Sequence, residues 1–200
     1  DERIWRMPIM CACKRQTVEQ QREQKRLDDI EALRKDCISD DGYREFRFKL
    51  DDQANPDISE ICRRYVDTWE QNQKHGIGIL FYGEVRTGKT FMACCVANAL
   101  IDRMVPAHVT NFMAILETLK GFDNKLEYIA YLQNVPLLVI DDLGIERDTP
   151  YAMEKIQHVV DARSRSQRPI IFTTNLSLET LSNPETTEQK RIYGRVLRMC

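Results

Sequence analysis

Apolar and polar positions divide the chain into two parts with different patterns. Residues 15–36 are dense in Glu, Gln, Lys and Arg and contain neither Pro nor Gly, so they favour a helix. Its few apolar residues include Leu27, Ile30 and Leu33, whose spacing gives only a thin stripe along one face. We therefore expect a helix that docks on another surface or stands in solvent.

The second part of the chain alternates short apolar runs with amphipathic segments. The apolar runs predict buried strands over residues 76–82, 107–112, 136–141 and 169–174. The amphipathic segments predict helices over residues 58–73, 90–104, 113–119, 126–133, 151–164, 178–181 and 186–199. Residues 43–50 alternate apolar with charged side chains and predict a short strand or an extended linker. Strands that alternate with helices indicate an α/β fold with a parallel sheet flanked by helices.

Composition limits the partners and the compartment. The formal net charge of the 200 residues is -2, which excludes a basic field over the whole surface, so any nucleic-acid contact needs a local patch. No apolar run approaches the roughly 18 residues of a transmembrane helix, and the N-terminus does not resemble a signal peptide. Seven irregularly spaced cysteines then favour a reducing, cytoplasmic setting, with Cys94 and Cys95 buried against the sheet.

The strongest chemical signal is a glycine-bounded segment between the first predicted strand and a helix. It reads Gly83, Glu84, Val85, Arg86, Thr87, Gly88, Lys89, Thr90, with Phe91 following, and matches the phosphate-binding pattern GxxxxGK[ST]. Such a loop binds phosphates through backbone N–H groups at the positive end of the helix. Lys89 would add a charge on the outer phosphates, and the hydroxyl of Thr90 would bind Mg²⁺. The sequence thus predicts ATP with magnesium as the ligand.

Two further strand ends carry polar residues. The apolar run at residues 137–140 ends in Asp141, a candidate Mg²⁺ ligand, and Asp142, a candidate for orienting the attacking water. The alternative is that both carboxylates cap the next segment. Asn175 follows the run at 169–174 and could help to place the water, although asparagine after a strand is also an ordinary turn residue.

Together these segments resemble the AAA+ ATPases, and more closely the DnaC/IstB group of ATP-binding proteins. The segments that carry this resemblance are GILFYGEVRTGKTFMACCVANAL, LLVIDDLGIER, RPIIFTTNLSLETL and QKRIYGRVLRMC. The resemblance implies a P-loop NTPase core at residues 57–200 and a partner-binding region with a charged helix and linker at residues 1–56. It implies that Asn175 is sensor 1 and that Arg191 is an arginine finger acting in a neighbouring subunit, with Arg195 as a second candidate. Self-assembly follows from a finger that acts in trans.

The sequence departs from the group's pattern in two places, and it also carries a cysteine pair near its N-terminus. Arg86 stands where the group usually has glycine, and it costs about 1 kcal/mol or more if the position needs positive φ. The group's sensor 2 arginine would lie beyond Cys200, so we expect a C-terminally truncated core. Cys11 and Cys13 form a CxC pair, for which zinc is expected only in a longer N-terminal form, because zinc sites usually need four ligands.

The sequence gives three candidate functions: the resemblance implies the first two, and the departures at Arg86 and at sensor 2 favour the third. The first is an ATP-hydrolysing loader that delivers a replicative helicase onto single-stranded DNA. The others are an IstB-type transposition helper and a nucleotide-bound interaction scaffold with little turnover. Arg163, Arg165 and Arg168 could meet DNA phosphates in a central channel, or could form a solvated helix end.

Overall fold

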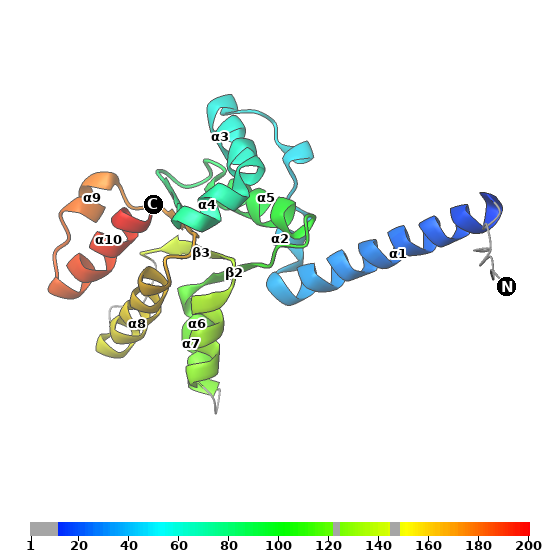
Figure 1. Cartoon of the computed structure of the whole chain (residues 1–200). Helices are drawn as coiled ribbons and strands as arrows, with labels where there is room; N and C mark the ends of the chain where they lie inside the picture. Colours follow the sequence, from blue (N-terminus) through cyan, green and yellow to red (C-terminus); the bar gives the residue numbers. More distant parts are fainter. Residues whose placement is uncertain (1–11, 122–124, 145–148) are drawn as a thin grey trace.

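The sheet consists of four parallel strands, as predicted. The computed structural model describes residues 12–121, 125–144 and 149–200. Within them the strands are β1 (Ile79–Tyr82), β2 (Ala107–Asn111), β3 (Leu137–Leu143) and β4 (Ile170–Thr174), in the spatial order β1-β4-β3-β2 (Figure 1). Each pairing is parallel. This order sets the carboxyl end of β4 between those of β1 and β3.

The helices of the described residues range from single turns to the long helix at the N-terminal side. They are α1 (Ala12–Cys37), α2 (Asp41–Glu45), η1, a 3₁₀ turn (Phe48–Leu50), α3 (Pro56–Asp67), α4 (Trp69–His75), α5 (Lys89–Ile101), α6 (Phe112–Gly121), α7 (Lys125–Asn134), α8 (Pro150–Ser166), α9 (Leu178–Ser182) and α10 (Thr187–Met199). None of the helices in this part of the chain is both long and apolar enough to span a lipid bilayer.

Both faces of the sheet are covered, because side chains alternate along each strand. Leu138 and Ile140 of β3 join a core with α6, α7, α8 and α10, whereas Leu137 and Val139 join a second core with α3 and α5. Cys94 and Cys95 on α5 are fully buried, which confirms the prediction for them. The nearly continuous apolar runs of the sequence follow from this double cover.

Two predicted elements are wrong in detail. Residues 43–50 contribute to α2 and η1 rather than to a strand or an extended linker, because the Asp40 side chain accepts a hydrogen bond from Tyr43 N and caps a helix there. The predicted helix 58–73 is two helices that meet at Thr68. The Thr68 hydroxyl donates back to Arg64 O at 2.9 Å, a contact that bends helices.

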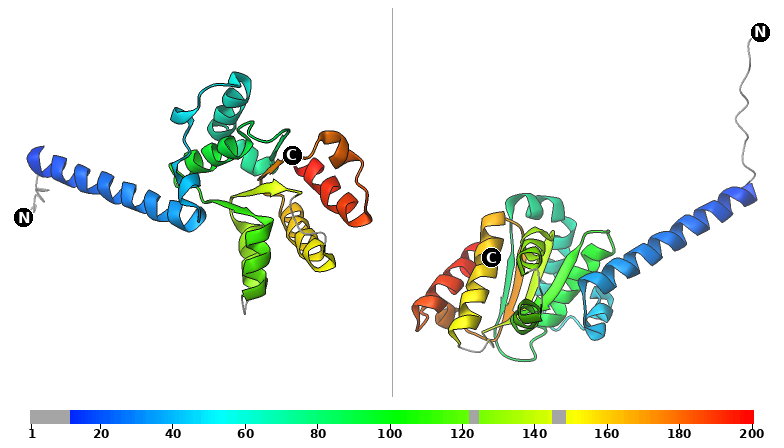
Figure 2. Two further views of the ribbon diagram at one scale, coloured as in Figure 1. Left: turned by 180° about the vertical axis from the view of Figure 1, so that it is seen from behind. Right: turned by 90° about the horizontal axis from the view of Figure 1, so that it is seen from below.

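Helix α1 is anchored through its C-terminal end and leaves the body of the molecule (Figure 2). Its residues 19–29 are exposed, whereas Ile30, Arg34 and Cys37 are buried. Ile38, immediately after the helix, forms a parallel bridge with Val109 at the edge of β2. The charged helix predicted for residues 15–36 is confirmed, and it both docks and stands in solvent.

Arg163 on α8 is fully buried, so neither sequence interpretation of this residue is correct. Its guanidinium donates to backbone carbonyls at the C-terminal end of α7 and in the turns that precede β3 and β4. The acceptors are the carbonyl oxygens of Leu132, Gln133, Val135, Pro136 and Pro169. The N–H groups on Nη1 and Nη2 serve these carbonyls together, and Pro169 O also accepts a hydrogen bond from Leu138 N at 3.5 Å. Arg165 is exposed and Arg168 is half-buried.

Candidate nucleotide-binding site

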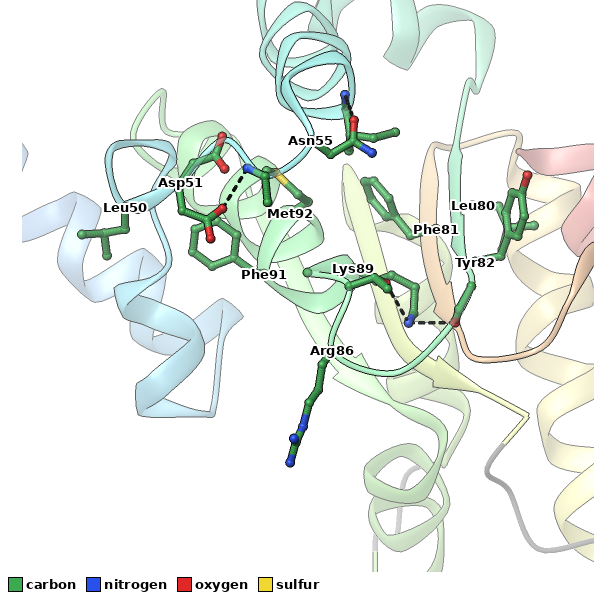
Figure 3. Close-up of a pocket in the computed structure, with 16 residues that line it drawn as sticks. Leu50, Asp51, Asn55, Leu80, Phe81, Tyr82, Arg86, Lys89, Phe91 and Met92 are labelled. Carbon is green, nitrogen blue, oxygen red and sulfur yellow. Dashed lines mark hydrogen bonds between the residues drawn. The ribbon is translucent and has the colours of Figure 1, made fainter.

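The glycine-bounded loop lies between β1 and α5, as its motif requires. Gly83 has φ 125° and Gly88 has φ 84°, so both positions need the left-handed freedom of glycine. A Cβ at either glycine would meet no atom within 4 Å, which leaves room for a ligand against the backbone. Lys89 Nζ donates to the carbonyl oxygen of Gly83 at 3.0 Å (Figure 3). It also donates to the carbonyl oxygen of Glu84 at 2.6 Å. The ammonium therefore sits within the curve of the loop.

Arg86 adopts φ 66°, so its backbone pays the conformational cost of about 1 kcal/mol that glycine would avoid. Figure 3 shows its side chain directed away from Lys89 and the rest of the pocket lining. In this conformation the guanidinium does not reach the phosphate end of the pocket, so its charge does not offset the conformational cost of the positive φ.

Asp141 is buried at the end of β3 and faces the start of α5. Its Oδ1 accepts hydrogen bonds from Thr90 Oγ1 at 2.8 Å and from Thr173 Oγ1 at 2.5 Å. Its Oδ2 accepts a hydrogen bond from the hydroxyl of Tyr43 at 3.0 Å. The structure thus brings together the two predicted magnesium ligands, Thr90 and Asp141. Burial, together with the charge of Asp141, raises the pKa of Tyr43 well above its ordinary value.

Asp142 sits in a bulge at the end of β3. The pairing with β4 shifts between Ile140 and Leu143, so β3 carries an extra residue there, and Asp142 has φ 57°. Its backbone N donates to Thr173 Oγ1 at 2.9 Å, which holds the bulge to β4. Burial raises the pKa of Asp142, the charge of Asp141 adds to the rise, and Lys89 opposes it. Non-glycine residues with such strained backbones cluster at functional sites.

The other two predicted residues lie on different elements. Asn175 follows β4 directly and is exposed at the edge of the sheet where β1 and β3 also end. Arg191 is exposed on α10, which packs on α8 and α9. Arg195 on the same helix is paired with Asp161 at 2.5 Å, so it is less available to a neighbouring subunit than Arg191.

A pocket of about 780 Å³ continues from the loop toward the segment that joins η1 to α3. Its outer wall is formed by Leu50, Asp51, Asp52, Ala54, Asn55 and Ile58, and its inner wall by β1, the loop and Phe91 (Figure 3). The sequence interpretation missed this outer wall, as well as Tyr43 and Thr173. Thr173 could have been found as a polar residue within an apolar run, whereas the other residues carry no local signal.

The residues fit magnesium-bound ATP. The glycines leave space along the loop, Lys89 supplies a cation, and the Asp141 carboxylate and Thr90 hydroxyl are the hard oxygen donors that magnesium prefers. For zinc, Cys11 lies outside the described residues and the side chain of Cys13 is not described either. Within the described part of the chain, no three His, Cys, Asp or Glu side chains cluster as metal ligands would.

Comparison with known sequences gives a consistent result. Residues 12–187 match the family described as "IstB-like ATP binding protein". The chain is 28% identical over 158 residues to the replicative helicase loader DnaC of Escherichia coli (strain K12), which covers 76% of this chain and 61% of that protein. It is 30% identical over 162 residues to the phage-like element PBSX protein XkdC of Bacillus subtilis (strain 168), covering 76% and 60%. The chain therefore spans about three fifths of the length of these relatives.

Solved structures agree on the fold. A crystal structure of DnaI superposes with a TM-score of 0.66 at 22% identity, covering 82% of this chain and 94% of the other. A putative primosome component from Streptococcus pyogenes serotype M3 gives 0.67 at 26% identity, covering 84% and 92%. AMPPCP-bound DnaA from Aquifex aeolicus gives 0.59 at 18% identity, covering 75% and 48%. With its parallel sheet, its phosphate loop and its family match over residues 12–187, this chain belongs to the IstB-like ATP-binding family and has the AAA+ P-loop fold.

Proposed function

We propose that this protein is an ATP-hydrolysing helicase loader, which uses ATP to deliver a replicative DNA helicase onto single-stranded DNA. The observation that carries the proposal is the hydrogen bond of 2.8 Å between Thr90 and Asp141, which joins the phosphate loop to the end of β3. Named helicase loaders among the relatives support the biological assignment.

Each residue of the site has a role in this proposal. Backbone N–H groups of residues 83–90 and the ammonium of Lys89 bind the phosphates. Thr90 and Asp141 hold magnesium, which, when bound, neutralises charge that develops on the transferred phosphoryl group. Asp142 orients the attacking water, and Asn175, which follows β4, helps to hold that water in place. The pocket wall at residues 50–58 encloses the nucleoside.

Catalysis in this proposal also needs a second subunit. Arg191 is exposed on α10 and would reach the site of a neighbouring copy, where an arginine stabilises the charge of the transition state. An arginine finger in trans makes hydrolysis depend on assembly, and assembly on DNA would make hydrolysis depend on DNA. The exposed part of α1 presents a mixed charged surface, which suits a protein partner such as the helicase.

Two other functions share the same core. The family match includes IstB-like proteins, so the alternative of a transposition helper that acts on target DNA has a specific basis. A nucleotide-bound scaffold with little turnover is favoured only by Arg86, whose strained backbone lies within the loop itself.

The test combines two measurements on the purified protein. ATP turnover is measured with and without single-stranded DNA beside Lys89→Ala, and helicase recruitment to single-stranded DNA is measured with ATP. The loader proposal expects DNA-stimulated turnover that Lys89→Ala abolishes, together with ATP-dependent recruitment of the helicase. Turnover without recruitment would favour the transposition helper, and tight ATP binding without turnover would favour the scaffold.

A further inference from the structure

Tyr43 forms a long-range contact with the magnesium end of the site. It lies on α2, 98 residues before Asp141 in the sequence, and its hydroxyl donates to Asp141 Oδ2 at 3.0 Å. Thr90 and Thr173 both donate to the other carboxylate oxygen. An ionised carboxylate offers about four lone-pair directions. Three donors on both oxygens therefore fix the plane of the Asp141 carboxylate and leave about one direction for a cation.

The backbone around Tyr43 is itself held by a buried amide. Asn98 on α5 is fully buried, and its Nδ2 donates to Tyr43 O at 2.8 Å and to Phe46 O at 3.0 Å. The Tyr43 ring packs against Phe46, with ring centroids 5.7 Å apart, and Phe46 packs against Phe91 on α5. The position of the Tyr43 hydroxyl therefore depends on contacts with α5 as well as on its own helix.

The same amide is connected to α1. Arg34 Nε donates to Asn98 Oδ1 at 3.0 Å, and the guanidinium also pairs with Glu31 at 2.7 Å and with Asp102, the residue that follows α5. The Arg34 side chain is only 6% exposed. Hydrogen bonds thus connect Arg34 on α1 to Asn98, and Asn98 to the backbone of Tyr43. The side chain of Tyr43 continues this connection to Asp141.

We propose that Tyr43 is a positioning residue for magnesium-bound nucleotide and that it couples this site to the anchor of α1. The inference rests on the proposed nucleotide site and adds a route by which the projecting helix affects it. A partner that displaces the anchor would shift Tyr43 and loosen the hold of Asp141 on magnesium. Because such coupling is reciprocal, magnesium-bound nucleotide would also strengthen the docked position of α1.

The first test measures magnesium dependence directly. A fluorescent ATP analogue is bound to the full chain, and magnesium is titrated for the unmodified protein, Tyr43→Phe and the control Tyr131→Phe. The Tyr131 hydroxyl lies 3.3 Å from His108 Nδ1 and has no hydrogen bond to Asp141, so its variant removes a matched hydroxyl elsewhere. Tyr43→Phe should raise the apparent dissociation constant for magnesium about tenfold, as loss of a hydrogen bond to a metal ligand does. Affinity for the analogue without magnesium should be unchanged.

A result in which Tyr43→Phe lowers thermal stability but leaves the magnesium constant equal to that of Tyr131→Phe would overturn the proposal. That pattern would mean that the hydroxyl serves packing alone. If the unmodified chain binds no nucleotide with or without magnesium, the nucleotide site fails, and this inference fails with it. If nucleotide binds but no helicase is loaded, the loader function fails while the role of Tyr43 is still tested.

The second test examines the connection to α1 through a double-mutant cycle. Arg34→Gln should raise the magnesium constant about threefold or more in the unmodified background. In the Tyr43→Phe background the same change should add little, because the shared route is already broken. Equal effects in both backgrounds would overturn the coupling. Asp102→Asn removes a half-exposed partner of Arg34 and repeats the cycle if Arg34→Gln does not fold.

Discussion

Arg195 Nε lies 2.5 Å from Asp161 Oδ1, and this ion pair joins α10 to α8. Both side chains are largely buried, at 27% and 18% exposure. Arg195 also donates to the carbonyl oxygen of Arg191 at 3.0 Å, one turn earlier on the same helix. The two arginines therefore differ in availability, although they are equivalent as cations in the sequence.

Replacement of Arg191 by alanine should lower DNA-stimulated ATP turnover at least a hundredfold, because an arginine finger supplies that much or more. Nucleotide affinity and the unfolding temperature should stay unchanged, since the side chain is exposed. Mixing Arg191→Ala with Lys89→Ala should restore part of the turnover, because the Lys89→Ala subunits still provide the finger. An Arg195→Ala variant should lose stability instead, and the opposite assignment of effects would contradict the prediction.

Replacement of Asp142 by asparagine should lower turnover about a hundredfold with little change in ATP affinity, as expected when a group that activates water is lost. The pKa of Asp142 is raised above its ordinary value of 3.8 by burial and by Asp141. The ionised form is the active one, so turnover should fall as pH is lowered through this raised pKa. A pH profile of turnover checks this, and the asparagine variant should lack that acidic limb.

Replacement of Arg163 by methionine should lower the free energy of unfolding by about 3 kcal/mol or more, because it removes the side-chain donor of buried carbonyls such as those of Leu132 and Val135. Arg165→Ala, two residues along and exposed, should change it by less than about 0.5 kcal/mol. Urea unfolding of both variants gives the comparison. If Arg163→Met instead weakened DNA binding at unchanged stability, the buried position would be wrong.

Acidification should destabilise the protein through His108. Burial lowers the pKa of His108 to about 4, and the contact with the Cys37 backbone offsets this only in part. The unfolded chain takes up the proton near pH 6.5 while the folded chain does not, so stability falls as pH is lowered from 6.5 toward 4. Between pH 7 and pH 5 the unmodified protein should lose up to about 2 kcal/mol more than His108→Gln. Urea titrations at both pH values measure this, and equal losses would contradict it.

The phosphate loop and the Asp141–Asp142 pair could be predicted because their chemistry lies in contiguous residues beside a buried strand. Their proximity in the fold could also be predicted, because the carboxyl ends of parallel strands lie at the same edge of a sheet. The contribution of Tyr43 could not be predicted, because it depends on α2 folding back over a strand end 98 residues away. Arg163 was misjudged for a related reason. Its acceptors are backbone carbonyls of other segments, and the sequence does not indicate which carbonyls need a side-chain donor.

Helix α1 extends far beyond the part of it that is anchored to the body of the molecule. At 1.5 Å per residue, the 18 residues from Ala12 to Asp29 extend about 27 Å from the anchor. Within the described residues, α1 contacts the body at its C-terminal end, where Ile30, Arg34, Cys37 and the following Ile38 are buried, so a partner bound near the tip would act on the body through this anchor. The strength of this anchor limits the force that a partner on α1 can transmit to the nucleotide site. A stronger pull would detach the helix before it moved the sheet.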